Sequence, residues 1–289
     1  MKITGFTIIK NALINDYPIV EAIKSVLPIV DDFIVLVGDN DDDTEQLIQS
    51  INSPKLRIHR SVWNKALNKG GAALADETNK AFDLIDKETT WAFYIQGDEC
   101  IHEKYHSEIL AATKKYAADP QVEGLLFKYL HFYGTYDYVG DSRKWYNKEV
   151  RIIRNNKEIR AYRDAQGFRR NGKKLAVKLI DAWVYHYGWV KSPIQMKKKL
   201  MTTGKLWHPA ETLQAMYDTT AVFDFSDFDS LAKFTGTHPS CMLPRISAAN
   251  WTLSLDTSQK KLSFKDRILT KIEKFTGKRL FAFRNYRII

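Results

Sequence analysis

Two kinds of chemistry compete within one short segment, residues 89–106, which reads TTWAFYIQGDECIHEKYH. An apolar run over residues 91–95 ends in the polar cluster Gln96-Gly97-Asp98-Glu99. A carboxylate that closes a buried strand in this way suits a divalent cation bound to phosphate, because hard cations prefer oxygen ligands. The first candidate chemistry is therefore a metal–nucleotide site at the end of a strand.

The second candidate is a zinc hydrolase, because His102, Glu103 and His106 match the pattern H-E-x-x-H. That pattern needs both histidines on one face of a helix, with the glutamate as general base and a third ligand downstream. Here it begins about one turn after a buried strand, and Glu108 is an unconvincing third ligand. We expect these residues to belong to a surface helix that follows the metal–nucleotide turn.

The elements that must position these residues alternate between strand and helix signals. The strand signals are continuously apolar rather than alternating, which is typical of a parallel sheet covered on both faces. The strands are expected within residues 2–11, 33–37, 55–62 and 91–96, and the helices within residues 16–30, 44–51 and 72–85. Further strands are expected within residues 122–134, 149–156 and 181–190, after a helix within residues 102–119.

Ligands of open parallel α/β sheets bind beyond the carboxyl ends of the strands. Four turns follow the expected strands and are therefore candidates for ligand binding: Lys10-Asn11, Gly38-Asp39-Asn40-Asp41, Trp63-Asn64 and the turn that holds Asp98. Gly38 and Gly97 allow the backbone to approach a ligand closely. Carboxylates repel a nucleoside diphosphate unless a divalent cation lies between them, so these turns predict a cation as well. The alternative for Asp41, Asp42 and Asp43 is a solvated acidic loop.

The order of these turns resembles the family 2 glycosyltransferases of GT-A fold. The resemblance covers roughly residues 1–190 and is carried by FTIIKN, VGDNDDDT, NKGGAALADETNKA and FYIQGDE. It implies a Rossmann-like, mostly parallel sheet flanked by helices, and a contact between Asp39 and the base or ribose. The segment from Lys69-Gly70-Gly71 to Asn79 occupies the place of the family's Gly-rich segment. The family's D-x-D motif becomes Gln96-Gly97-Asp98, which keeps the metal-binding aspartate and places an amide at the nucleotide contact.

The later strands extend the resemblance to a metal ligand and a catalytic base. WVYHYGWV resembles the family's late strand with a histidine, which makes His186 the partner of Asp98 at Mn²⁺ or Mg²⁺. AYRDAQGFR lies where inverting members place the carboxylate that deprotonates the acceptor, which implies Asp164, with Glu149 and Asp141 as rivals. Without the resemblance, His186 is as readily a core residue of an aromatic strand, and Asp164 an ordinary turn residue. The implied donor-binding residues are Lys10, Asn11, Gly38, Asp39, Lys69, Gly70, Gln96, Gly97 and Asp98.

Composition limits the class of partner. The chain has 289 residues, 44% of them hydrophobic and 27% charged, as expected for a globular protein with a sizeable core. Its net charge of +10 indicates anionic partners, namely nucleotides, lipid headgroups or nucleic acid. Two distant cysteines, Cys100 and Cys241, and the lack of a signal peptide or an apolar span favour the cytoplasm.

We expect a GT-A domain over residues 1–190 and a basic, helical C-terminal extension over residues 191–289. Within that extension, SFKDRILTKIEKFTGKRLFAF has apolar and basic residues at helical spacing, compatible with peripheral contact at the inner face of the cell membrane. The alternative is a basic helix that packs against its own domain. The expected activity is inverting, metal-dependent transfer of a hexose from a nucleotide sugar to a glycan or lipid-linked acceptor. The family implies bacterial surface-polysaccharide assembly as the setting. A nucleic-acid-binding module is the remaining alternative, but the aromatic residues lie in apolar strands and no RNA- or DNA-binding motif is present.

Overall fold

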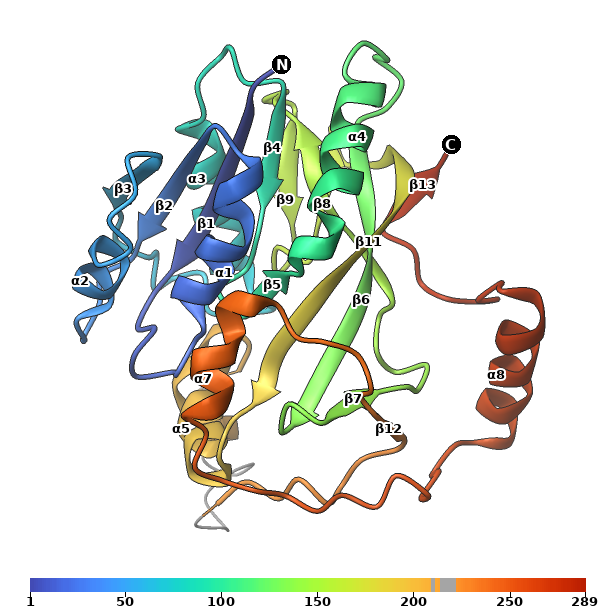
Figure 1. The fold of residues 1–289 in the computed structure, drawn as a ribbon. Helices are drawn as coiled ribbons and strands as arrows, with labels where there is room; N and C mark the ends of the chain where they lie inside the picture. The colour runs from blue at the N-terminus through green and yellow to red at the C-terminus, as the bar shows by residue number, and fades with distance from the viewer. Residues whose placement is uncertain (209–210, 214–221) are drawn as a thin grey trace.

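Four parallel strands form the N-terminal half of the sheet, in the order β3-β2-β1-β4 (Figure 1). The computed structural model describes residues 1–208, 211–213 and 222–289. Residues of β1 pair in parallel with both β2 and β4, so the carboxyl ends of these strands meet at one edge. The strands span Ile3–Ile9 (β1), Asp32–Val37 (β2), Leu56–Arg60 (β3) and Trp91–Tyr94 (β4).

Helices cover both faces of this parallel part. Phe33 and Val35 of β2 pack in the cluster that includes α1 (Ile19–Val26) and α4 (His106–Tyr116). Ile34 and Leu36 point to the opposite face, into the cluster that includes α3 (Ala72–Asp83). Because successive side chains of a strand point to opposite faces, a strand buried on both sides is mostly apolar, as residues 33–37 of β2 and all of β4 are, whereas the half-buried edge strand β3 carries charged residues. The short α2 (Thr44–Gln49) follows β2.

Beyond β4 the sheet becomes mixed. The antiparallel β8 joins β4 to β6, and the long β11 then pairs in parallel with β6. The short β5 pairs antiparallel with β11, which places Glu99 opposite His186. The strands of this part are β5 (Glu99–Ile101), β6 (Gly124–Gly134), β7 (Tyr138–Gly140), β8 (Lys148–Arg154), β9 (Ile159–Tyr162), β10 (Gly167–Arg170) and β11 (Lys173–Val190).

The C-terminal hundred residues are less helical than the sequence suggests. Two short strands return to the sheet: β12 pairs with β7, and β13 pairs in parallel with β11. The division of the chain near residue 190 stays a prediction. The described helices and strands here are α5 (Pro193–Thr203), the 3₁₀ turn η3 (Gly204–Leu206), β12 (Leu231–Lys233), the 3₁₀ turn η4 (Ser240–Met242), α7 (Leu243–Ser247), α8 (Phe264–Thr276) and β13 (Tyr286–Ile288).

The expected fold class is confirmed as a mixed α/β fold with a parallel-rich sheet flanked by helices. The early expected strands and helices all form, with ends that differ by a few residues from the sequence expectation. Within the described parts of the chain, every helix is too short or too polar to cross a bilayer.

Candidate functional site

The turns after β1 and β2 come together at the carboxyl edge of the sheet. The Lys10 Nζ atom lies 2.7 Å from Asp39 Oδ1. Gly38 donates its N–H to the Ile9 carbonyl oxygen at 2.8 Å, which brings the two turns side by side. The arrangement offers a cation and a carboxylate next to each other, where a ribose hydroxyl or a base could bind to both.

Most of the acidic turn after β2 stabilises the fold instead of facing a ligand. Asn11 Nδ2 donates to Asp41 Oδ2 at 2.9 Å, and the Asp41 N–H donates to Asn11 Oδ1 at 2.8 Å. Asp42 Oδ2 accepts the N–H of Ile14 at 2.8 Å. These carboxylates are therefore more than a solvated loop, because the oxygens of Asp41 and Asp42 accept hydrogen bonds that hold the turns after β1 and β2 together. Asn11 contributes both a donor and an acceptor to the same contact.

Trp63 lies in the turn after β3, one of the four turns selected from the sequence, and adds an indole donor to this edge. Its backbone N–H donates to Asp39 Oδ1 at 3.1 Å. Its side chain is buried, yet its indole Nε1–H has no acceptor among the described residues. A Cβ atom on Gly38 would lie 2.5 Å from Nε1, so only glycine allows the indole this position. A buried donor without a partner is costly, and a ligand acceptor would satisfy it.

Glu99 holds the Gln96-Gly97-Asp98 turn in place. Its carboxylate is buried, accepts the Gln96 N–H at 3.1 Å, and forms a bidentate pair with Arg151 at 2.7 and 2.8 Å. Tyr129 donates its hydroxyl to the same carboxylate at 2.8 Å. Since Glu99, Arg151 and Tyr129 are all buried, the turn is rigid at the point where Asp98 leaves the sheet. The sequence shows Glu99 only as a neighbour of Asp98, and Arg151 only as a strand residue.

Asp98 and His186 lie side by side, as the resemblance implied. Asp98 Oδ2 is 3.7 Å from His186 Nε2 and 3.5 Å from the Nζ atom of Lys199. Gly188 makes the approach possible, since a Cβ there would lie 2.7 Å from Asp98 Oδ2 and 2.9 Å from His186 Nε2. Burial alone would raise the pKa of Asp98, but His186 when protonated, together with Lys199 and Lys191, lowers it below its ordinary value. Asp98 is therefore ionised at neutral pH.

The hydrogen bond with His131 fixes the tautomer of His186, so that the Nε2 atom facing Asp98 carries a lone pair. His131 Nε2 lies 2.7 Å from the Tyr146 carbonyl oxygen, which can only accept, so Nε2 carries the proton. Burial lowers the pKa of His131 to about 3, so its Nδ1 is unprotonated and accepts from His186 Nδ1 at 3.3 Å. Burial also lowers the pKa of His186, and its Nε2 is consequently a free ligand atom. Metal-ligating histidines are oriented in this way by a partner on the other ring nitrogen.

Two lysines from the segment after β11, the buried Lys191 and the half-buried Lys199, complete the cationic side of the site. Lys199 Nζ donates to the Gly188 carbonyl oxygen at 2.8 Å and lies 5.0 Å from the centre of the Tyr17 ring. Burial lowers the pKa of Lys199, and it lowers that of Lys191 to about 7. An anion bound between these lysines would favour their charged forms. The sequence marks this region only as basic.

Asp98 and His186 fit a divalent cation that takes its remaining ligands from a diphosphate and water. The pair presents one carboxylate oxygen and one imidazole lone pair, a donor set that suits Mn²⁺. No group of three or more His, Cys, Asp or Glu side chains that could hold a metal ion occurs within residues 1–208, 211–213 and 222–289. Mg²⁺ in phosphate sites commonly has only one or two protein ligands, with the substrate phosphates and water supplying the others. We expect the cation to bind together with the nucleotide.

The Gly-rich segment and Asp164 also come together. A Cβ on Gly71 would lie 2.5 Å from the Cβ of Asp164, and the Gly71 N–H donates to the Leu206 carbonyl oxygen at 3.0 Å. Arg163 and Ala165, on either side of Asp164, both have positive φ, 58° and 60°. Non-glycine residues rarely adopt this conformation, and such strain is concentrated at functional sites. Lys69 and Gly70 form the exposed rim of this segment.

The two rivals of Asp164 differ from it in their surroundings. Glu149 is buried on β8, and burial raises its pKa to about 8, so it is protonated at neutral pH and cannot accept a proton there. Asp141 lies at the β7–β12 pair, where it accepts hydrogen bonds from Ser230 and, at 3.1 Å, from Lys260. Of the three carboxylates, Asp164 alone packs against the Gly-rich segment in the structure as described.

The H-E-x-x-H residues do not form a zinc site. His102 precedes the 3₁₀ turn η2 (Glu103–Tyr105), and α4 begins only at His106, so the two histidines do not share a helix. His102 Nε2 pairs with Thr237 Oγ1 at 2.8 Å, whereas His106 Nε2 donates to the Ser25 carbonyl oxygen at 2.9 Å. The zinc-hydrolase alternative therefore lacks its geometry, because the helix expected within residues 102–119 begins only at His106. These residues position α4.

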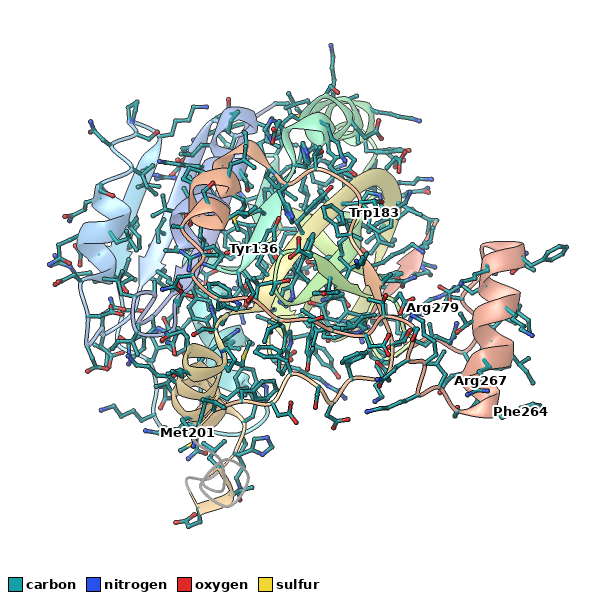
Figure 2. The ribbon with its side chains drawn as sticks, turned by 60° about the horizontal axis from the view of Figure 1, so that its bottom comes forward. Tyr136, Trp183, Met201, Phe264, Arg267 and Arg279 are labelled. Atoms are coloured by element: carbon teal, nitrogen blue, oxygen red, sulfur yellow. The ribbon has the colours of Figure 1, made fainter. Side chains whose placement is uncertain are left out.

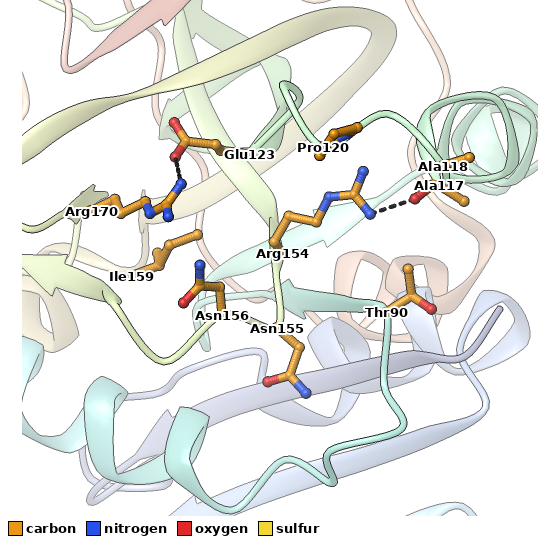
Figure 3. Close-up of a pocket in the computed structure, with 10 residues that line it drawn as sticks. All are labelled: Thr90, Ala117, Ala118, Pro120, Glu123, Arg154, Asn155, Asn156, Ile159 and Arg170. Carbon is orange, nitrogen blue, oxygen red and sulfur yellow. Dashed lines mark hydrogen bonds and ion pairs between the residues drawn. The ribbon is translucent and has the colours of Figure 1, made fainter.

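A pocket of about 430 Å³ lies at the opposite edge of the sheet, near Thr90 (Figure 3). Arg154 in this pocket donates to backbone carbonyl oxygens, including that of Ala117 at 2.6 Å. Arg170 pairs with Glu123 at 3.1 Å. The guanidinium groups thus already have partners, carbonyl oxygens for Arg154 and a carboxylate for Arg170, and none of the candidate site residues lines this pocket.

No protein-family model matches the chain, and no curated protein matches it in sequence. Among solved structures, TarS from S. aureus is 15% identical, with a TM-score of 0.41 over 70% of this chain and 39% of that one. TarS residues 1–349 in complex with UDP gives 14% identity and a TM-score of 0.41, over 75% and 70% of the two chains. Glucosyl-3-phosphoglycerate synthase from Mycobacterium tuberculosis, with Mn²⁺, UDP and phosphoglyceric acid, gives 15% identity and a TM-score of 0.31, over 45% and 43%. Likenesses at these TM-scores add nothing to the geometry described above.

Proposed function

We propose that this protein is a glycosyltransferase, which transfers a hexosyl group from a nucleoside diphosphate sugar to a glycan or lipid-linked acceptor. One observation carries the proposal. An ionised, half-buried Asp98 lies 3.7 Å from the free Nε2 of His186, at the edge of the parallel sheet where ligands of such folds bind. The resemblance of the ordered turns to family 2 glycosyltransferases supports the same activity, and a role in bacterial surface-polysaccharide assembly goes with that resemblance.

The donor nucleotide would bind across the turns after β1, β2 and β3. Lys10 and Asp39 offer a cation and a carboxylate to the ribose or base. The unpartnered Nε1–H of Trp63 offers a donor to a base carbonyl group. Because Gln96 replaces the first aspartate of the resembled motif, its side chain can donate as well as accept, which favours contact with a ligand acceptor.

The diphosphate would bind where Asp98, His186 and Lys199 meet. Transfer breaks the bond between the sugar anomeric carbon and a phosphate oxygen, and negative charge develops on the departing diphosphate. A divalent cation held by Asp98 and His186 would supply Lewis-acid stabilisation of that charge. Lys199 and Lys191 are positioned to add positive charge beside Asp98, where partial burial makes each charge more effective than in water.

Asp164 would accept the proton of the acceptor hydroxyl as that oxygen attacks the anomeric carbon. Attack from the face opposite the diphosphate gives inversion of configuration. The packing of Asp164 against Gly71 supports this role, because it places the carboxylate beside the Gly-rich segment of the donor site. Glu149 stays protonated at neutral pH and does not compete for the proton.

The test is a thermal-shift panel of nucleotides and nucleotide sugars, with and without Mn²⁺. One nucleoside diphosphate is expected to stabilise the protein more with Mn²⁺ than without, by about 2.7 kcal/mol at a ligand concentration of about 100 Kd. Asp98→Asn should abolish the Mn²⁺-dependent part of the shift. Asp181→Asn is the matched control, because its exposed carboxylate pairs only with Lys128 among the described residues. A panel without any Mn²⁺-dependent shift, or equal shifts in both variants, would refute the proposed function.

A further inference from the structure

The helix α8 stands apart from the rest of the molecule while both of its ends are anchored (Figures 1 and 2). Before the helix, the Lys261 N–H donates to the Asp229 carbonyl oxygen at 2.7 Å. After it, β13 pairs with β11. No side chain of α8 is buried, and its main ion pair with the body joins Glu273 to Arg143 at 2.5 Å. The helix is therefore held in place without being covered.

The uncovered side of α8 is apolar and aromatic. Phe264 is 80% exposed, Phe275 is 92% exposed and Ile268 is 44% exposed. At about 100° per residue, positions separated by four and eleven residues lie within about 40° of one another on a helix. These three side chains therefore form one stripe along nearly the whole helix. Phenylalanine is seldom left in water when it can be buried, so a continuous stripe of this kind marks an interaction surface.

Basic residues lie on both sides of that stripe. Arg267, Lys271 and Lys274 lie on one side and Lys265 on the other, and all four side chains are exposed. The acidic residues of the helix point elsewhere, because Glu273 faces Arg143 of the body and Asp266 caps the helix start with Ser263. The outer surface of α8 thus combines a hydrophobic stripe with flanks of one charge sign.

The segment after α8 continues the same surface chemistry. Phe281 is 86% exposed and Phe283 is 73% exposed. From residue 264 to residue 287 the chain has eight basic and two acidic residues, a net charge of +6. More than half of the net charge of +10 thus lies in this short part of the chain.

We propose that the outer face of α8 and the segment that follows form a docking surface for an anionic lipid bilayer. In this mode the Phe264, Ile268 and Phe275 side chains enter the headgroup–acyl boundary while the flanking lysines and arginines contact lipid phosphates. A helix with aromatic residues on one face and basic flanks is typical of binding in the plane of a membrane surface. A second copy of this chain fits less well, because it would bring two surfaces of the same strong charge together. The proposal does not rest on the proposed enzymatic function.

The experiment is cosedimentation of the full chain with vesicles of phosphatidylcholine alone, or of phosphatidylcholine mixed with phosphatidylglycerol. Binding is expected to the mixed vesicles only and to weaken at high salt. Lys271→Glu with Lys274→Glu should weaken it about a hundredfold or more, since the two reversals change the charge by four units and each unit near an anionic surface contributes about fivefold. The matched control is Lys114→Glu with Lys115→Glu on α4, where the lysines are equally exposed and the change in net charge is the same.

Insertion of the aromatic stripe is tested separately. Phe264→Ser with Phe275→Ser should lower vesicle binding about tenfold or more, and circular dichroism should be unchanged because neither side chain is buried. Phe275→Trp should add a fluorescence component that shifts to the blue with mixed vesicles and is quenched by brominated lipids. Equal binding to both vesicle types, equal loss in the α4 control, or an unshifted tryptophan would overturn the proposal. So would a concentration-dependent dimer that the double serine variant abolishes, since the occupant would then be a second copy.

Discussion

Glu149 is a buried carboxyl group whose charge state makes the stability of this fold depend on pH. Burial raises its pKa to about 8, Arg151 opposes that effect, and the carboxylates of Glu99 and Asp164 add to it. Its Oε2 atom accepts no hydrogen bond from the described residues, so the ionised form would be buried without full compensation. We predict that Glu149→Gln, which keeps the shape and removes the titration, stabilises the protein in alkaline solution.

The magnitude follows from the two pKa values. The ordinary pKa of the glutamate side chain is 4.5, so between pH 4.5 and about 8 the folded chain keeps a proton that the unfolded chain has lost. Because the folded state then binds more protons, the free energy of unfolding falls as the pH rises through this window. The fall is at most about 1.4 kcal/mol per pH unit, and up to about 5 kcal/mol over the whole window.

The assay is urea denaturation of the unaltered chain and of Glu149→Gln across that pH window. The unaltered chain should lose stability as the pH rises, whereas Glu149→Gln should lack this contribution and be several kcal/mol more stable at about pH 8. Glu108→Gln, which alters an exposed carboxylate on α4, is the control and should follow the curve of the unaltered chain. Parallel curves for the unaltered chain and Glu149→Gln would refute the reasoning.

Three further outcomes test the site. Asp164→Asn should abolish sugar transfer in steady-state assays while the thermal shift with donor persists; near-normal turnover would remove Asp164 as the base. Gly188→Ala should weaken nucleotide-dependent Mn²⁺ binding, followed by electron paramagnetic resonance, about 10- to 100-fold by separating the two ligands. Its control is Gly172→Ala, because Gly172 has φ +75° and a Cβ atom there would have no neighbour within 4 Å. This variant should lower the free energy of unfolding without changing Mn²⁺ binding. Glu99→Gln should lower the free energy of unfolding by about 3–5 kcal/mol in urea titrations, because Arg151 loses its buried partner, and a loss below about 1 kcal/mol would contradict that role.

The parallel part of the fold could be predicted from the sequence because its signals are local. A strand buried on both faces must be apolar throughout, and β2 and β4 are recognisable on that basis alone. Ligands bind beyond the carboxyl ends of such strands, so Lys10, Asp39 and Asp98 could be selected without coordinates. The short strands β5, β12 and β13 were missed because three residues carry too little periodicity to be distinguished from a turn.

The pairing of Asp98 with His186 depended on the resemblance, and the tertiary structure supplies its physical cause. The antiparallel register of β5 with β11 places Glu99 opposite His186, and Gly188 leaves room for Asp98 Oδ2. The H-E-x-x-H pattern matched in sequence but not in structure, because His102 and His106 do not lie on the shared helix that a zinc site needs. A local pattern states which residues are near in sequence, whereas a site depends on which are near in space.

The sequence alone therefore established the α/β class, the order of the early strands and the turns that hold Lys10, Asp39 and Asp98. The sequence also selected the turn that holds Trp63, but only the tertiary structure revealed that its indole donor is unpartnered, and that Lys199 reaches the site from a segment with no recognisable motif. The physical reason is that strands and helices are recognised from the spacing of apolar residues within a short window of the chain. The contacts of a buried polar side chain are instead decided by which distant strands and helices pack around it, where an unpaired group would be costly.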